Sequence, residues 1–176
     1  MRQLLLCLAL AAALPVQADS YTWGKKQFEY DYDEEKKPWE EIQAQMPAAP
    51  KAEALMPFTL DATATGKYYI DGNSLSVGED GVVRYTVVIV SAQGARTVNF
   101  EGMRCTTGER KIYAFGRPNG EWARNRYPRW EPINARQQSS YHRELFFSYF
   151  CAGGEGLPDL ARIQYRLKTG GYRPPQ

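Results

Sequence analysis

The sequence predicts an α+β fold, in which an antiparallel meander sheet of about five to six strands is packed by one or two C-terminal helices and crosslinked by one disulfide. A β-branched and aromatic run over 82–90 is followed by a Gly-containing turn at 91–95 and an alternating segment over 97–102. This pattern indicates a long antiparallel hairpin, with the second strand exposing one face to water. Helical periodicity begins only after residue 139. Sheet and helices are therefore segregated along the chain.

Residues 1–18 have the organisation of a secretory signal peptide. Arg2 precedes the apolar run LLLCLALAAAL, and Val16-Gln17-Ala18 has the small residues of a signal-peptide cleavage site. We expect cleavage after Ala18 and a periplasmic location. Cys7 lies too early in the apolar run for a lipoprotein anchor, so a lipoprotein or cell-surface location is the less favoured alternative. No later run is long enough to predict a transmembrane span.

Residues 19–57 read as an acidic lead-in that contains Pro and Ala. From Asp19 to Asp61, ten acids stand against five lysines. Pro38 at a first turn favours a short helix that ends before the Pro-rich segment 47–50. Trp39 is expected to anchor this segment on the domain, and disorder throughout the lead-in is the alternative.

The domain proper is expected over 58–170, followed by a tail over 171–176. Alternation in the segment after the hairpin predicts that Tyr113 and Phe115 share a core face. The other expected extended segments and their turns are a strand at 67–71, a turn at 72–73, a strand at 74–77, a turn at Asp80-Gly81, a strand at 109–115, and a turn at 118–120 that leads into Glu121-Trp122.

Two helices are expected after residue 139. The first is capped by Ser139 or Ser140, and the second runs from Pro158 to Lys168 with Gly170 beyond its end. We expect the apolar stripe of the first helix to lie across the sheet. The stripe consists of Tyr141, Leu145, Phe146, Tyr149 and Phe150.

Only two cysteines remain after removal of the signal peptide. Cys105 ends the predicted hairpin, and Cys151 ends the predicted first helix. In an oxidising compartment, two such cysteines most simply form a disulfide. Two buried free thiols are the alternative.

Several of these segments resemble a known family. They are 74–85, Gly94-Ala95, 100–105, 113–116, Trp122 and 149–151. The pattern is similar to the cryptic neisserial protein one-like family of exported bacterial proteins, over about residues 37–170. The resemblance implies an envelope protein of Gram-negative bacteria and supplies no catalytic residue.

A more distant similarity is to surface-adhesin protein E-like domains. It is carried by a strand pair followed by Cys, a Trp and a late Cys. In those domains a bent antiparallel sheet is packed by helix, and members bind host matrix proteins. The chain departs from them in its loop lengths and in its arginine-rich segment.

The sequence offers little catalytic chemistry. His142 is the only histidine, and helical spacing places it away from the apolar stripe, as an exposed or edge residue. One histidine and a paired disulfide are too few ligands for a zinc or copper site, so we expect no metal and no cofactor. The chain has no nucleophile elbow, phosphate loop or Cys-x-x-Cys motif. We therefore expect no enzymatic activity.

One enzymatic alternative remains open at this stage, an enzyme that acts on an envelope polymer through paired carboxylates. Two carboxylates facing each other in a cleft are the chemistry that glycosidases need. Single acids on wet strand faces are more often solubilising. The candidates are Glu101, Glu109, Glu121 and Glu131.

The strongest positive signal is basic. Nine bases stand against three acids between Arg104 and Arg143, and aromatic residues interleave with them. Arginine offers a planar fork for carboxylate or phosphate and stacks on aromatic rings. The alternative is that the acidic lead-in or nearby carbonyls satisfy these arginines within the chain. The predicted binding residues are Arg117, Trp122, Arg124, Arg126, Tyr127, Arg129 and Trp130.

These observations favour an exported, noncatalytic binding or envelope-associated protein. An anionic envelope glycan, a lipid head group or an acidic protein would suit the arginines. Export disfavours nucleic acid as the natural partner, although such a patch would bind it in a salt-dependent way. A purely structural subunit, which would be marked by a contiguous apolar surface patch, is a third possibility.

Overall fold

The computed structural model describes residues 38–60, 64–134, 140–152 and 157–172. All of them belong to the compact unit Pro38–Gln176. The predicted signal peptide, lead-in residues 19–37 and the last four residues of the tail lie outside the described residues.

The described strands form one antiparallel sheet of eight strands. They are β1 (Leu55–Phe58), β2 (Lys67–Asp71), β3 (Ser76–Val77), β4 (Val82–Val90), β5 (Arg96–Arg104), β6 (Glu109–Gly116), β7 (Trp122–Arg124) and β8 (Glu131–Pro132). Their order in the sheet is β1-β2-β4-β5-β6-β7, with β3 paired to β4 and β8 paired to β6. The predicted meander is confirmed, and two strands, β1 and β8, were not expected. A 3₁₀ turn, η1 (Ala52–Ala54), precedes β1.

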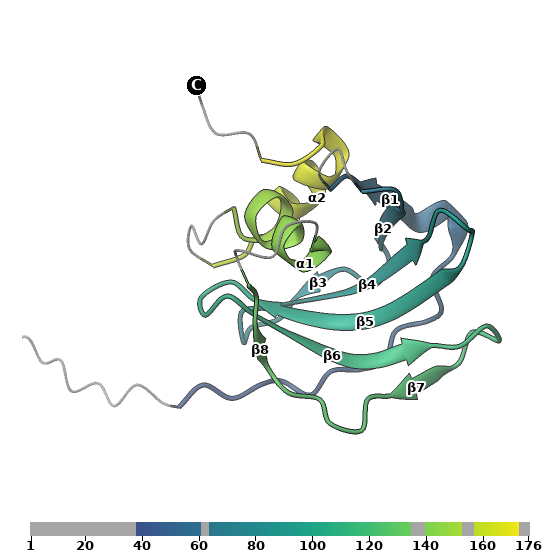
Figure 1. Ribbon diagram of the computed structural model, residues 1–176. Coiled ribbons are helices and arrows are strands. Elements are labelled where there is room, and N and C mark those ends of the chain that lie inside the picture. The colour runs from purple at the N-terminus through teal and green to yellow at the C-terminus, as the bar shows by residue number, and fades with distance from the viewer. Residues whose placement is uncertain (1–37, 61–63, 135–139, 153–156, 173–176) are drawn as a thin grey trace, which may run out of the picture. The chain divides into compact units, whose positions relative to one another are not determined.

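Both predicted helices are present and cover one face of the sheet (Figure 1). The first begins as α1 (Tyr141–Glu144) and continues as the π-helical segment η2 (Leu145–Phe150). The second is α2 (Leu160–Thr169). Asp159 caps α2 by accepting a hydrogen bond from the Arg162 N–H, and Gly170 ends it with a left-handed φ of 86°.

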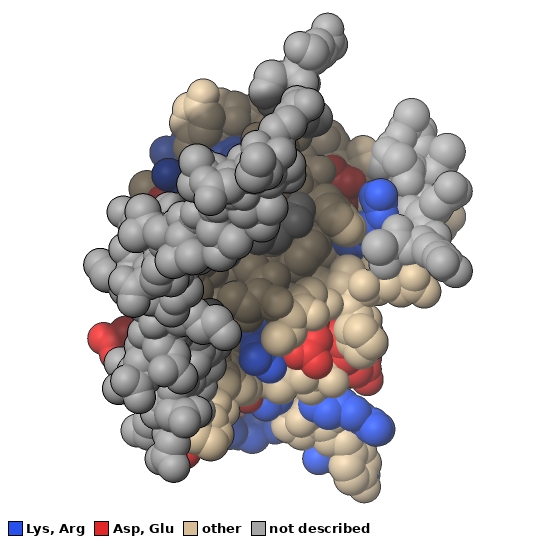
Figure 2. Space-filling view, turned by 90° about the vertical axis from the view of Figure 1, so that its left-hand side faces the viewer, with Lys and Arg blue, Asp and Glu red and all other residues tan. Residues whose placement is uncertain are grey.

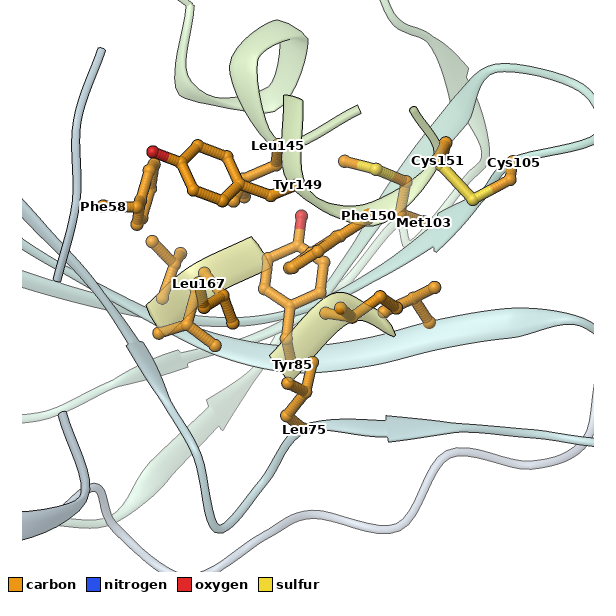
Figure 3. Packing of buried hydrophobic residues seen from close by; sticks show 14 residues of the cluster. Phe58, Leu75, Tyr85, Met103, Cys105, Leu145, Tyr149, Phe150, Cys151 and Leu167 are labelled. Atoms are coloured by element: carbon orange, nitrogen blue, oxygen red, sulfur yellow. A yellow bond between two sulfur atoms is a disulfide. The ribbon is translucent and has the colours of Figure 1, made fainter. Parts of the chain in front are cut away.

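The main core lies between these helices and the sheet (Figure 3). The ring of Tyr85 on β4 meets Phe150 with centroids 4.9 Å apart, and Phe58 on β1 meets Tyr149 at 5.6 Å. The predicted apolar stripe is confirmed, because Leu145, Tyr149 and Phe150 are buried and its other members pack against this core.

The opposite face of the sheet carries an extended segment, Pro38–Pro50, which we call the strap (Figure 1). The short helix predicted to start at Pro38 is wrong, because the strap contains no helix. The expected anchoring by Trp39 is confirmed, since its indole N–H donates to the carbonyl of Asp80 at 2.9 Å. Side-chain contacts to distant strands, rather than local hydrogen bonds, therefore determine the conformation of the strap.

The prediction that Tyr113 and Phe115 share a core face is also wrong. The β5–β6 register shifts between Phe100 and Glu101, and this irregularity breaks the alternation of β6. Tyr113 is buried against Phe100 in a second, smaller cluster beneath the strap, whereas Phe115 is 43% exposed.

The predicted disulfide is confirmed. Cys105, directly after β5, is bonded to Cys151, directly after η2. The bond ties the end of the first helix to the end of the second long strand, beside the main core (Figure 3).

Replacing both cysteines by serine should lower the free energy of unfolding by about 4 kcal/mol, because the bridge closes a long loop in the unfolded chain. The two cysteines are 46 residues apart. Urea unfolding without reductant measures the change. As a control, reductant should lower the stability of the wild type and leave the double variant unchanged. Alkylation of both Cys105 and Cys151 in the unreduced protein would contradict the bridge.

Candidate anion-binding surface

The predicted binding residues lie along β7 and in the segments on either side of it. Arg117 is in the β6–β7 turn, Trp122 and Arg124 are on β7, and the other four follow before β8. Figure 2 shows Lys and Arg side chains gathered at the lower end of the view, at the level of β7 and its following loop in Figure 1. The structure thus brings these residues to one edge of the sheet.

Two of the predicted aromatic residues turn toward the strap. The Trp122 indole N–H donates to the carbonyl of Pro47 at 2.7 Å. The Trp130 indole N–H donates to the Glu41 carboxylate at 3.1 Å. Both rings therefore hold the strap in place, and the charged and phenolic groups beside them remain for a ligand.

Glu41 of the strap shows how this face holds a carboxylate. Besides Trp130, Lys111 Nζ lies 2.7 Å from one Glu41 oxygen, and the Tyr113 hydroxyl donates to the other at 2.8 Å. Burial alone would raise the pKa of Glu41, but the hydrogen bonds from Lys111, Tyr113 and Trp130 and the charge of Lys111 lower it overall. Burial and the neighbouring Glu41 raise the pKa of Tyr113 well above its ordinary value.

Several other bases have partners within the chain. Arg110 lies 2.8 Å from Glu131. Arg104 lies 3.1 Å from Glu109, and its guanidinium stacks on the Trp39 ring with 3.7 Å between the guanidinium carbon and the ring centroid. The alternative that the arginines are satisfied internally is therefore correct for this part of the basic segment.

The bases on and after β7 differ from these. Arg124, Arg126 and Arg129 are exposed, and no ion pair joins them to another described residue. Tyr127, between them, is 76% exposed. Arg117 is paired with Glu121 at 4.0 Å, but both side chains are at least 60% exposed, so water weakens this ion pair.

The loop that carries these arginines is attached to the sheet through Asn125. Its backbone N–H donates to the Tyr113 carbonyl at 2.8 Å, and its side-chain amide donates to the Ile112 carbonyl at 3.0 Å. Between the loop and the strap lies a hollow of about 240 Å³. It is lined by Glu41, Gln43, Ala44, Met46, Lys111, Tyr113, Arg124, Asn125 and Pro128.

The four candidate glutamates do not converge on one cleft. Glu109 and Glu131 are each occupied by an arginine, and Glu121 accepts a hydrogen bond from the Asn119 amide at 2.9 Å on the surface. Glu101 is fully buried on the helix-covered face. The arrangement that two cooperating carboxylates require is therefore not formed by these residues.

Glu101 instead forms a buried polar network with the first helix. Its carboxylate accepts hydrogen bonds from the hydroxyls of Tyr85 at 2.8 Å and Tyr141 at 2.7 Å, and from the Asn99 amide at 3.1 Å. His142 Nε2 lies 2.9 Å from the same carboxylate. Because an ionised carboxylate can only accept, Nε2 must carry the proton in this contact.

Two sequence expectations are corrected by this network. His142 was expected at an exposed or edge position, but its side chain is only 12% exposed. Successive helical residues differ by only about 100° in direction, so His142 in the first turn reaches Glu101 beside Tyr141. The water-facing side expected for Asn99 and Glu101 is instead covered by the helix.

One sequence signal could have revealed this burial. Apart from Arg84 and Thr86, the run over 82–90 is apolar on both faces, which indicates cover on both sides of β4. Its hairpin partner β5 must share that cover, and Tyr85 pairs directly with Glu101 in the register. A glutamate on the core face of such a hairpin must be buried together with its hydrogen-bond donors.

None of the described helices is long and apolar enough to cross a membrane. No group of three or more His, Cys, Asp or Glu side chains capable of holding a metal ion is found among the described residues.

The family resemblance seen in the sequence is confirmed by a match to a family model. A family model described as the CNP1-like family matches residues 34–168. The chain belongs to this family. The CNP1-like match covers the strap, every strand and nearly all of α2. No curated protein and no solved structure matches the chain.

Replacing Glu101 by glutamine should lower the free energy of unfolding at pH 7 by about 3 kcal/mol, because it breaks a buried charged network. Burial alone would raise the pKa of Glu101, but the contacts from His142, Tyr141 and Tyr85 lower it overall. The ionised form therefore stabilises the fold above the ordinary pKa of 4.5, and this contribution is lost as the pH falls through the lowered folded-state pKa. Urea unfolding between neutral and acid pH should show a smaller acid loss in Glu101→Gln than in the wild type.

Glu131→Gln is the matched control, because the Glu131 side chain is 45% exposed in its pair with Arg110. It should remain within about 0.5 kcal/mol of the wild type and retain the wild-type acid profile. An unchanged stability and acid profile in Glu101→Gln would show that the network contributes nothing.

Proposed function

We propose that this protein is an exported, noncatalytic binding module of the cell envelope, which holds an anionic ligand on the surface formed by β7 and its following loop. One observation carries the proposal. Arg124 at the end of β7, and Arg126 and Arg129 on the following loop, are exposed without an acidic partner among the described residues, while Arg104, Arg110 and Lys111 nearby are paired. Unpaired guanidiniums beside an exposed tyrosine are suited to carboxylate, sulfate or phosphate groups.

The Glu41 contacts support the same reading. Beneath the loop, Lys111, Tyr113 and Trp130 already bind a carboxylate supplied by the strap. Arg124 lines the same hollow and has no carboxylate partner among the residues that the structure describes. A ligand carboxylate at Arg124 would meet an already ordered environment, which lowers the cost of binding.

The location is part of the proposal. The arrangement of Arg2, the apolar run and Val16-Gln17-Ala18 supports export to the periplasm. The disulfide between Cys105 and Cys151 agrees with an oxidising compartment. An envelope glycan, a lipid head group and an acidic protein all carry the required charge.

Replacing Arg124, Arg126 and Arg129 together by alanine should weaken binding to immobilised heparin by about tenfold or more at low ionic strength, because three charge-assisted contacts are removed. The elution salt concentration of the mature protein measures the effect. The side chains are exposed, so the substitutions should leave thermal stability nearly unchanged.

Arg162→Ala/Lys168→Ala is the control for nonspecific charge, since both exposed bases lie on α2. This variant should elute close to the wild type. Replacing the three loop arginines by lysine retains the charge and separates its contribution from that of the guanidinium fork. A wild type that is not retained at low salt, or a triple alanine variant that is retained equally well, would refute anion binding here.

A further inference from the structure

A second basic group lies at the far end of β7. Arg96, at the start of β5, is exposed and has no ion pair with another described residue. It lines a hollow of about 270 Å³ together with Arg117 and Trp122. The remaining lining residues are Ala49, Pro50, Val98, Gly116, Pro118, Asn119 and Gly120. Arg96 was not among the predicted binding residues.

The walls of this hollow are well ordered. A Cβ at Gly116 would lie 2.8 Å from the Val98 Cβ, so only glycine allows β5 and β6 to approach this closely. The β6–β7 turn is closed by a hydrogen bond from the Gly120 N–H to the Arg117 carbonyl at 3.0 Å, with Gly120 at a φ of 87°. The strap forms the remaining side, fixed by the bond from Trp122 to Pro47.

Acidic charge does not fill this hollow. Glu121 is the acid nearest to Arg117, at 4.0 Å, and it already accepts from the Asn119 amide. Its side chain is 67% exposed, so solvent screens much of its charge. Two guanidiniums and an indole therefore line a space that a sulfate or carboxylate group and its carrier can enter.

The two basic groups have a fixed separation. Arg96 and Arg117 lie at the beginning of β7, whereas Arg124 and the loop arginines lie at its end. The three residues of β7 span about 10 Å at the usual rise of a strand. A ligand with one anionic group can occupy only one group of arginines, but a linear polymer with repeated charges can occupy both.

We propose that the ligand is a linear acidic glycan, with carboxylate or sulfate groups along its length, that runs beside β7 from the Arg96–Arg117 hollow to the Arg124–Arg129 loop. This proposal rests on the proposed function and names its ligand class. The exposed ring of Tyr127 provides a flat apolar surface for a sugar ring beside the charges. Occupying both groups raises affinity because the second contact forms within the already bound complex.

The test is a length series of heparin-derived oligosaccharides, from disaccharide to dodecasaccharide, titrated into the mature protein by calorimetry at fixed low salt. The dodecasaccharide should bind at least about tenfold more tightly than the disaccharide, which is too short to reach both groups. Arg96→Ala should weaken the dodecasaccharide by roughly fivefold and the disaccharide by less than about twofold. Arg162→Ala, which removes the same charge from α2, should change neither.

The possible results separate the two proposals. Equal affinity across the series, with no effect of Arg96→Ala, overturns the linear-glycan proposal, while loss of binding in the loop variant would still support anion binding. Absence of binding at every length overturns both. Polyglutamate is the comparison ligand: if it binds with the same dependence on length and on Arg96 while the oligosaccharides bind weakly, the ligand is an acidic protein segment and the glycan class is wrong.

Discussion

The β4–β5 hairpin is buried on both faces, and the rest of the structure depends on providing that cover. Nine residue pairs join the two strands in unbroken register. On one face, Val83, Tyr85 and Val87 pack under the helices. On the other, Phe100 and its neighbours are covered by the strap. An apolar hairpin of this length would otherwise present a large exposed apolar face, which drives association.

The two covers use different chemistry. The helices contribute aromatic rings, a disulfide and the Glu101 network, and the polar atoms of that network are matched within the core. The strap contributes few apolar groups and relies on polar contacts at Trp39, Glu41 and Pro47. The acids of the strap and of β6 and β8 occupy the bases next to them, whereas the arginines around the end of β7 are exposed without such a partner among the described residues.

Much of the fold could be predicted because its signals are local. Alternation, turn residues and helix caps identify the central hairpin and both helices, and the count and placement of the cysteines indicate the disulfide, before any contact is known. The strap, the β6 irregularity and β8 could not be predicted, because contacts between residues far apart in the sequence determine them. Lys111, for example, meets Glu41 across 70 positions. The arginine surface was predicted by composition, but which arginines remain unpaired depends on these same distant contacts.

The strap has a consequence for how the chain acquires its structure. It precedes the sheet in sequence, yet its partners lie on β6 and β7, on β4 and in the turn before β4, so its docking site is complete only after those strands have paired. Until then Tyr113 and Trp122 are without cover. The earliest part of the described chain is thus among the last to adopt its final conformation, and the aromatic surface of β6 and β7 stays exposed in that interval.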